Sequence, residues 1–157
     1  MVQVATAETP LHNPRGFHAA KVDSAGRLKL PAAIHEYLDR LADKTLIVGL
    51  LKGTARIYTN GSFDNNLAKL DSKPALRAAI SMEMDRTGGN VSMDPQHRIT
   101  LPQTLRKEME LEEQTVHLRF YDDVVFMYTQ TQFEEVTGAA RKAIEENFGD
   151  AEELGFV

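Results

Sequence analysis

The chain has 157 residues, 42% of them apolar, so it can bury a core without disulfide or metal staples. It has no cysteine, which excludes disulfides and cysteine-ligated zinc and favours an intracellular protein. The formal net charge is -5, but residues 1–107 hold 15 Lys and Arg against 10 Asp and Glu, and residues 108–157 hold 3 against 13. This asymmetry allows a basic surface on an acidic protein.

The first residues predict no regular structure. Residues 1–13 mix small, polar and proline residues without periodicity, which indicates a flexible leader. They lack the charged start and apolar stretch of a signal peptide, and no apolar run reaches the roughly 20 residues needed to cross a bilayer. We therefore expect neither export nor a membrane partner.

A hairpin and a helix are expected next. Phe17–Val22 suits a short strand, Asp23–Gly26 has turn chemistry, and Arg27–Leu30 alternates as a returning strand. Pro31 fits the first turn of a helix of about three turns, with an apolar face made of Ile34, Leu38 and Leu41.

Two strands and two helices complete this part of the chain. Lys44–Leu51 and Thr54–Thr59 are expected to pair around a Lys-Gly turn. A helix should start near Ser62, a good N-cap, and Pro74–Arg86 predicts a connecting helix ended by two glycines.

One phrase occurs twice. Residues 22–31 and 93–102 both read apolar residue, Asp, three residues, Arg, apolar, polar, Leu, Pro, with an offset of 71. The elements after the second copy repeat the earlier order, and the expected ranges are strands 90–93 and 98–101, helix 102–109, strands 115–121 and 124–128, and amphipathic helix 131–147. The chain therefore divides into leader 1–13, first repeat 14–72, connecting helix 73–88, second repeat with C-terminal helix 89–147, and tail 148–157.

The repeated residues resemble those of the MraZ transcriptional regulators, which belong with the AbrB and MazE type of DNA-binding proteins. Arg15-Gly16, Asp23 and the run from Gly26 to Pro31 look like the start of such a chain, and residues 94–102 look like its second motif. The resemblance implies an α+β fold, mainly β. It further implies a double-split β-barrel of two pseudo-symmetric repeats with swapped hairpins and flanking helices.

The resemblance also implies a function. The family forms homo-oligomeric rings and binds repeated short boxes in double-stranded DNA upstream of the division and cell wall gene cluster. A cytoplasmic, nucleoid-associated protein without cofactor, small-molecule substrate or enzymatic activity is the corresponding expectation.

The Asp-x-x-x-Arg spacing also predicts specific hydrogen bonds. Asp23 and Asp94 can accept backbone N–H groups in their turns and orient Arg27 and Arg98, which the family motif makes the leading DNA contacts. An arginine fork on a two-stranded ribbon suits a major groove. The alternative is a surface ion pair within each turn, contributing about 0 to 1 kcal/mol.

Further basic residues flank the first turn. Arg15, Lys21 and Lys29 are candidates for phosphate contacts, and ordinary solvated charge is the alternative for each. Arg106 follows the second motif, and its equivalent in the first copy is His35; solvation or a structural salt bridge is at least as good an explanation for both.

The second turn departs from the family pattern, which usually has Gly in both copies. His97 stands where the first copy has Gly26, so the turn must accept a positive φ at His97 or change its geometry. Pro95 constrains the same turn. We therefore assign DNA contact to Arg27 with more weight than to Arg98.

The sequence also bears on other classes of protein. The five histidines show no metal-ligand spacing with carboxylates, and the sequence has no phosphate loop or nucleophile elbow, so catalysis and a bound metal are not expected. An oligomeric scaffold that lost DNA binding and a MazE-type antitoxin stay open as alternatives. An antitoxin would usually have one motif and a disordered partner-binding tail.

Overall fold

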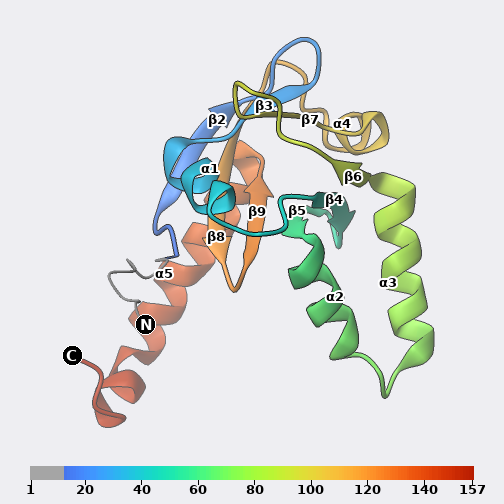
Figure 1. Ribbon diagram of the computed structural model, residues 1–157. Coiled ribbons are helices and arrows are strands. Elements are labelled where there is room, and N and C mark those ends of the chain that lie inside the picture. Colours follow the sequence, from blue (N-terminus) through green and yellow to red (C-terminus); the bar gives the residue numbers. More distant parts are fainter. Residues whose placement is uncertain (1–12) are drawn as a thin grey trace, which may run out of the picture.

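The computed structural model describes residues 13–157 (Figure 1), so the predicted leader lies almost wholly outside the described residues. The strands are β2 (Phe17–Lys21), β3 (Arg27–Lys29), β4 (Leu46–Leu51), β5 (Thr54–Thr59), β6 (Gly89–Val91), β7 (Arg98–Thr100), β8 (Thr115–Tyr121) and β9 (Val124–Tyr128). The helices are α1 (Ala32–Asp39), α2 (Asn60–Ala68), α3 (Pro74–Thr87), α4 (Gln103–Met109) and α5 (Gln130–Glu153). The chain is therefore α+β, as expected, but its helices hold more residues than its strands, so the expectation of a mainly β fold is wrong.

The two sequence repeats interleave in two antiparallel sheets. The larger sheet has the order β2-β8-β9-β5-β4-β6, and β3 pairs with β7 in a separate two-stranded ribbon. Strand β2 of the first copy pairs with β8 of the second, and the equivalent strand β6 of the second copy pairs with β4 of the first. Each of the eight strands in residues 13–157 therefore pairs with a strand of the other copy.

The prediction of a hairpin around each repeated motif is wrong: the turns form, but the strands on either side of each turn do not pair with each other as ladders. The flanking strands of the first motif meet only at an isolated bridge between Val22 and Leu28, and then diverge to β8 and β7. The second motif behaves alike, since β6 pairs with β4 and β7 with β3. Alternating residues predict strands, but they do not predict which strands pair.

The double-split barrel is not confirmed. Strands β2 and β6 end the six-stranded sheet on either side, so the strand pairing of residues 13–157 contains no closed barrel. The hydrophobic core lies between the sheet, the ribbon and helices α1 and α4. Leu28 and Ile99 face each other across the ribbon and are fully buried, which fixes the inner face of β3 and β7.

Three helices differ from their predicted limits. Helix α1 has eight residues, about two turns, and ends at Asp39. The N-cap of α2 is Thr59, whose side chain accepts the backbone N–H of Ser62, so Ser62 lies inside the helix. Helix α5 runs through the predicted tail to Glu153, beginning at a capping box of Thr129 and Gln132.

Helices α2 and α3 form an arm beside the sheet, and α5 projects away from it at the other side (Figure 1). Gly88 ends α3 against strand β4, where a Cβ would overlap the Val48 carbonyl. Among residues 13–157, no helix combines the length and apolar character needed to span a bilayer.

Candidate nucleic-acid interface

The two motif turns have the same internal hydrogen bonds. In the first, Asp23 Oδ1 accepts the backbone N–H groups of Ala25 and Arg27 at 3.0 and 2.8 Å. In the second, Asp94 Oδ1 accepts those of Gln96 and Arg98, both at 2.9 Å. The carboxylates therefore fix the loop backbone, as the spacing predicted.

His97 accepts the backbone conformation that Gly26 has in the other turn. Its φ is 60°, and that of Gly26 is 79°. Both residues donate their N–H to the carbonyl of the Asp three positions earlier, at 2.9 Å. The second turn therefore keeps the geometry of the first, and His97 pays a conformational strain of about 1–2 kcal/mol that Gly26 avoids.

Each turn also orients its arginine. Arg27 Nε donates to Asp23 Oδ2, and Arg98 Nε donates to Asp94 Oδ2, both at 2.8 Å. The surface ion pair within each turn, the alternative to DNA contact, is thus present in both copies. This ion pair uses only the Nε atom of each arginine. Within residues 13–157, the two Nη atoms of Arg27 and the two Nη atoms of Arg98 donate no hydrogen bond.

The hydrogen bonds stabilise the charged carboxylates. The pKa of Asp23 is lowered mainly by the backbone N–H of Arg27, with the Arg27 guanidinium adding to the effect and desolvation opposing it. The pKa of Asp94 is lowered by the corresponding groups of Arg98. Both aspartates are therefore ionised at neutral pH and hold the arginine side chains in place.

The ribbon β3–β7 presents its basic residues on one face. Because Leu28 and Ile99 point into the core, their neighbours Arg27, Lys29 and Arg98 point to the opposite face. Lys29 lies directly across from Arg98 in the register. The fold thus brings together three of the five basic residues predicted to contact DNA. Lys29 and Arg98, which face each other, come from different copies.

The other two basic residues lie along β2. Lys21 is exposed at the end of this strand, next to the first turn. Arg15 lies two residues before its start, and β2 alone advances by about 13 Å, so Arg15 is remote from the ribbon.

A helix residue of the other copy covers each turn. The guanidinium of Arg106, from α4, lies against Gly26, where a Cβ would overlap it. Its Nε donates to the Leu101 carbonyl at 2.9 Å, and its side chain is 18% exposed. This supports the structural explanation for Arg106 over a free cation.

At the second turn, the imidazole of His35, from α1, stacks on that of His97. The rings are 3.7 Å apart and within 5° of parallel. The Nε2 atom of His97 lies 3.2 Å from Asp39 Oδ2, and the Nδ1 atom of His35 lies 3.9 Å from the same oxygen. Sequence reasoning missed this cluster, although the offset of 71 aligns His35 with Arg106 and His97 with Gly26.

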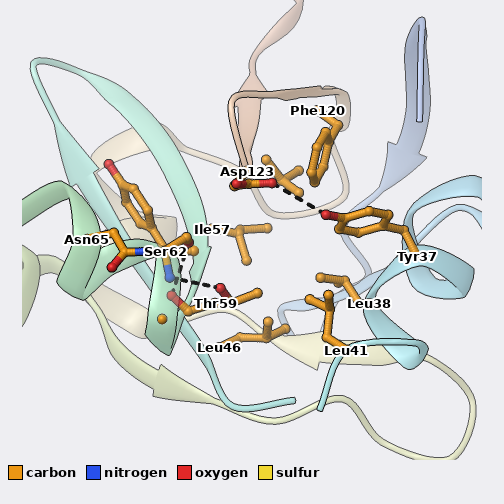
Figure 2. A pocket seen from close by; sticks show the side chains of 13 residues that line it. Tyr37, Leu38, Leu41, Leu46, Ile57, Thr59, Ser62, Asn65, Phe120 and Asp123 are labelled. Atoms are coloured by element: carbon orange, nitrogen blue, oxygen red, sulfur yellow. Dashed lines mark hydrogen bonds between the residues drawn. The ribbon is translucent and has the colours of Figure 1, made fainter. Parts of the chain in front are cut away.

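A separate cavity of about 250 Å3 lies between α1 on one side and α2 and β5 on the other (Figure 2). Its lining is largely apolar and includes Leu46 and Ile57, and Tyr37 donates a hydrogen bond to Asp123 at one rim at 3.4 Å. Burial raises the pKa of Tyr37, and the Asp123 carboxylate adds to this. A tyrosine whose pKa is raised above 10.0 is not poised to act as an acid or base near neutral pH.

Known proteins resemble this chain over most of its length. Residues 75–156 match the family model described as "MraZ protein, putative antitoxin-like". A "Transcriptional regulator MraZ" from Koribacter versatilis is 30% identical over 137 residues, covering 84% of this chain and 93% of the relative. A protein of the same name from Acidobacterium capsulatum is 34% identical over 101 residues, covering 62% of this chain and 69% of the relative.

Proposed function

Because the chain belongs to the MraZ family of transcriptional regulators, we propose that it binds specific double-stranded DNA through the outer face of its β3–β7 ribbon. The observation that carries this proposal is the joint presentation of Arg27, Lys29 and Arg98 on one face. The family consists of transcriptional regulators and not of enzymes, which confirms the expectation against catalysis.

The ribbon has the shape and chemistry to read a major groove. A two-stranded β-ribbon fits that groove, and guanidinium Nη atoms can donate to the O6 and N7 atoms of guanine. Asp23 and Asp94 hold each Nε, so the free Nη atoms of Arg27 and Arg98 are already oriented. Preorganisation lowers the entropy that binding must offset.

The remaining basic residues would position the protein on the phosphates. Lys21 and Lys29 flank the first turn and are exposed, so we assign them phosphate contacts near the ribbon. Arg15 lies beyond the far end of β2, and this strand alone separates it from the first turn by about 13 Å. Its phosphate contact would therefore be on flanking DNA.

The finer family properties are part of the same proposal. We propose a homo-oligomeric ring, a cytoplasmic and nucleoid-associated location, and tandem target boxes upstream of the division and cell wall gene cluster. We also propose that the ribbon and sheet together form the family's double-split barrel. An apolar stripe on α5 supports a subunit contact, since Val136, Ile144 and Phe148 are 39%, 55% and 43% exposed on one helical face.

Binding of the protein to its own upstream DNA tests the proposal. We expect Arg27→Ala to weaken specific binding by about 5- to 150-fold, the loss of one bidentate base contact, while the oligomeric state is unchanged. Arg98→Ala should have a smaller effect. Arg77→Ala, an exposed arginine on α3, is the matched control and should bind as the parent protein does.

Two outcomes would contradict the proposal. Equal affinity of the parent protein and Arg27→Ala would remove the ribbon from the interface. An intact oligomer that binds its upstream DNA no better than unrelated DNA would favour the scaffold alternative.

A further inference from the structure

The second motif turn has a cluster of potential metal ligands beside it that the first motif turn lacks. His35, Asp39 and His97 place one nitrogen or oxygen each within 4.8 Å of one another. The equivalent positions of the first turn hold Arg106, Glu110 and Gly26, which include one potential ligand. Both histidines therefore differ from the residues at the equivalent positions of the other copy, and their rings contact each other.

From this geometry we propose that His35, Asp39 and His97 bind one divalent transition-metal ion of the Zn2+ class per chain. Two imidazoles and a carboxylate form a ligand set typical of zinc sites with one open position. The expectation from sequence that the chain binds no metal is revised accordingly. Helix α1 supplies two ligands four residues apart on one face, and the turn before β7 supplies the third.

The distances suit a shared ion. Ligand atoms in tetrahedral zinc sites have bonds of about 2.1 Å, which places neighbouring ligands about 3.4 Å apart. The His97 Nε2 to Asp39 Oδ2 distance is 3.2 Å, and the His35 Nδ1 to Asp39 Oδ2 distance is 3.9 Å. The His97 and Asp39 atoms are therefore already close to this spacing, and rotation of an imidazole would have to bring the third ligand atom to the same point.

An unsatisfied atom gives an independent indication. The Nδ1 atom of His35 is buried and has no hydrogen-bond partner within the described residues. A buried nitrogen without a partner carries a desolvation cost that a hydrogen bond or a metal bond would remove. Since 3.9 Å is too long for a hydrogen bond to Asp39, an ion between the two groups would satisfy both.

The cluster is accessible to an ion from solution. Asp39 and His97 line a surface hollow of about 410 Å3 together with Lys44 and Asp94. Asp94 is already held by Arg98, so it is not free to act as a fourth ligand. The open position would be filled by water, which is the usual arrangement at a three-ligand zinc site.

Coordination has a geometric consequence for the stacked rings. Their planes are within 5° of parallel, so their in-plane lone pairs do not converge on one point. Binding must turn at least one imidazole out of the stack. The ring signals of His35 and His97 in NMR spectra are therefore expected to shift on addition of Zn2+, whereas those of His18 and His117 should not.

Co2+ is the probe for the test, using full-length untagged protein first stripped with a chelator. We expect one Co2+ per chain, with visible d–d absorption that Zn2+ displaces. Asp39→Asn and His97→Gly should each weaken Co2+ binding about tenfold or more, since each removes a ligand. His97→Gly restores the residue of the first repeat, and Asp39→Asn preserves shape, so two independent variants guard against misfolding. His18→Gln, which removes a histidine elsewhere, is the matched control.

Three results would overturn the site. The first is the absence of Co2+ binding by the parent protein. The second is equal binding by the parent and a folded Asp39→Asn variant. The third is a tenfold loss in His18→Gln, which would place the ion at another histidine. DNA is absent from this experiment, so its outcome is independent of the proposed function.

Discussion

Replacing Gly26 by alanine tests whether Arg106 of the second copy packs on the first turn. Gly26 has a φ of 79°, where an alanine is strained, and an added Cβ would overlap the Arg106 guanidinium. Gly53, in the β4–β5 hairpin, has a φ of 77° and nothing within 4 Å of an added Cβ. Alanine at either position therefore has the same strain from a positive φ, but only at Gly26 would its Cβ overlap a neighbouring side chain, that of Arg106.

The expected magnitudes follow from this difference. Gly53→Ala should lower the free energy of unfolding by about 1 kcal/mol, the cost of a left-handed conformation. Gly26→Ala carries the same cost plus displacement of Arg106 and loss of its hydrogen bond to the Leu101 carbonyl, a further ~1 kcal/mol. The added cost is modest because the displaced atoms are at the end of a flexible side chain.

Urea unfolding of the parent protein, the single variants Gly26→Ala, Gly53→Ala and Arg106→Ala, and the double variant Gly26→Ala/Arg106→Ala measures these free energies. The double variant should lose less than the sum of its single changes, by about 1 kcal/mol, because Arg106 is then no longer displaced. If Gly26→Ala and Gly53→Ala destabilise equally, the packing of Arg106 on this turn is refuted.

Three further predictions concern the ribbon. Leu28→Ala should lower the free energy of unfolding by about 2–5 kcal/mol in urea, since Leu28 is fully buried, and a loss below 1 kcal/mol would contradict its place in the core. Because the folded-state pKa of Asp94 is lowered from 3.8, its stabilising contribution is present above that pH and lost as the pH falls through the lowered value. Asp94→Asn should therefore reduce the loss of stability between pH 5 and pH 2 in thermal unfolding, and an unchanged loss would argue against it. DNA affinity should fall steeply with salt because phosphate contacts release counterions, and a flat dependence in fluorescence anisotropy would exclude Arg27 and Lys29 from the interface.

Local chemistry was readable from the sequence. The Asp-x-x-x-Arg spacing predicted carboxylates that accept backbone N–H groups and orient an arginine, and both turns have these bonds. The bounds of β5, β8 and β9 also match the predictions. These features depend on residues a few positions apart, whose preferences act before any tertiary contact forms.

Pairing between distant residues was not readable. The sequence predicts a hairpin around each motif, yet β3 pairs with β7 and β2 with β8. The prediction is wrong because the alternation of side chains is the same whichever strand is the partner. The first residues of α2 and α5 likewise depend on N-caps at Thr59 and Thr129, which compete with other candidates nearby.

The sequence by itself determined the duplication, the α+β class, the family and the turn chemistry around Asp23 and Asp94, since all of these are encoded in short ordered strings. Only the tertiary structure decided that the copies interleave and that helix residues of one copy cover the turn of the other. It therefore placed Arg106 against Gly26 and His35 against His97. The physical reason is that such contacts join residues more than 60 positions apart, and their positions are fixed by packing of the whole core rather than by local preference.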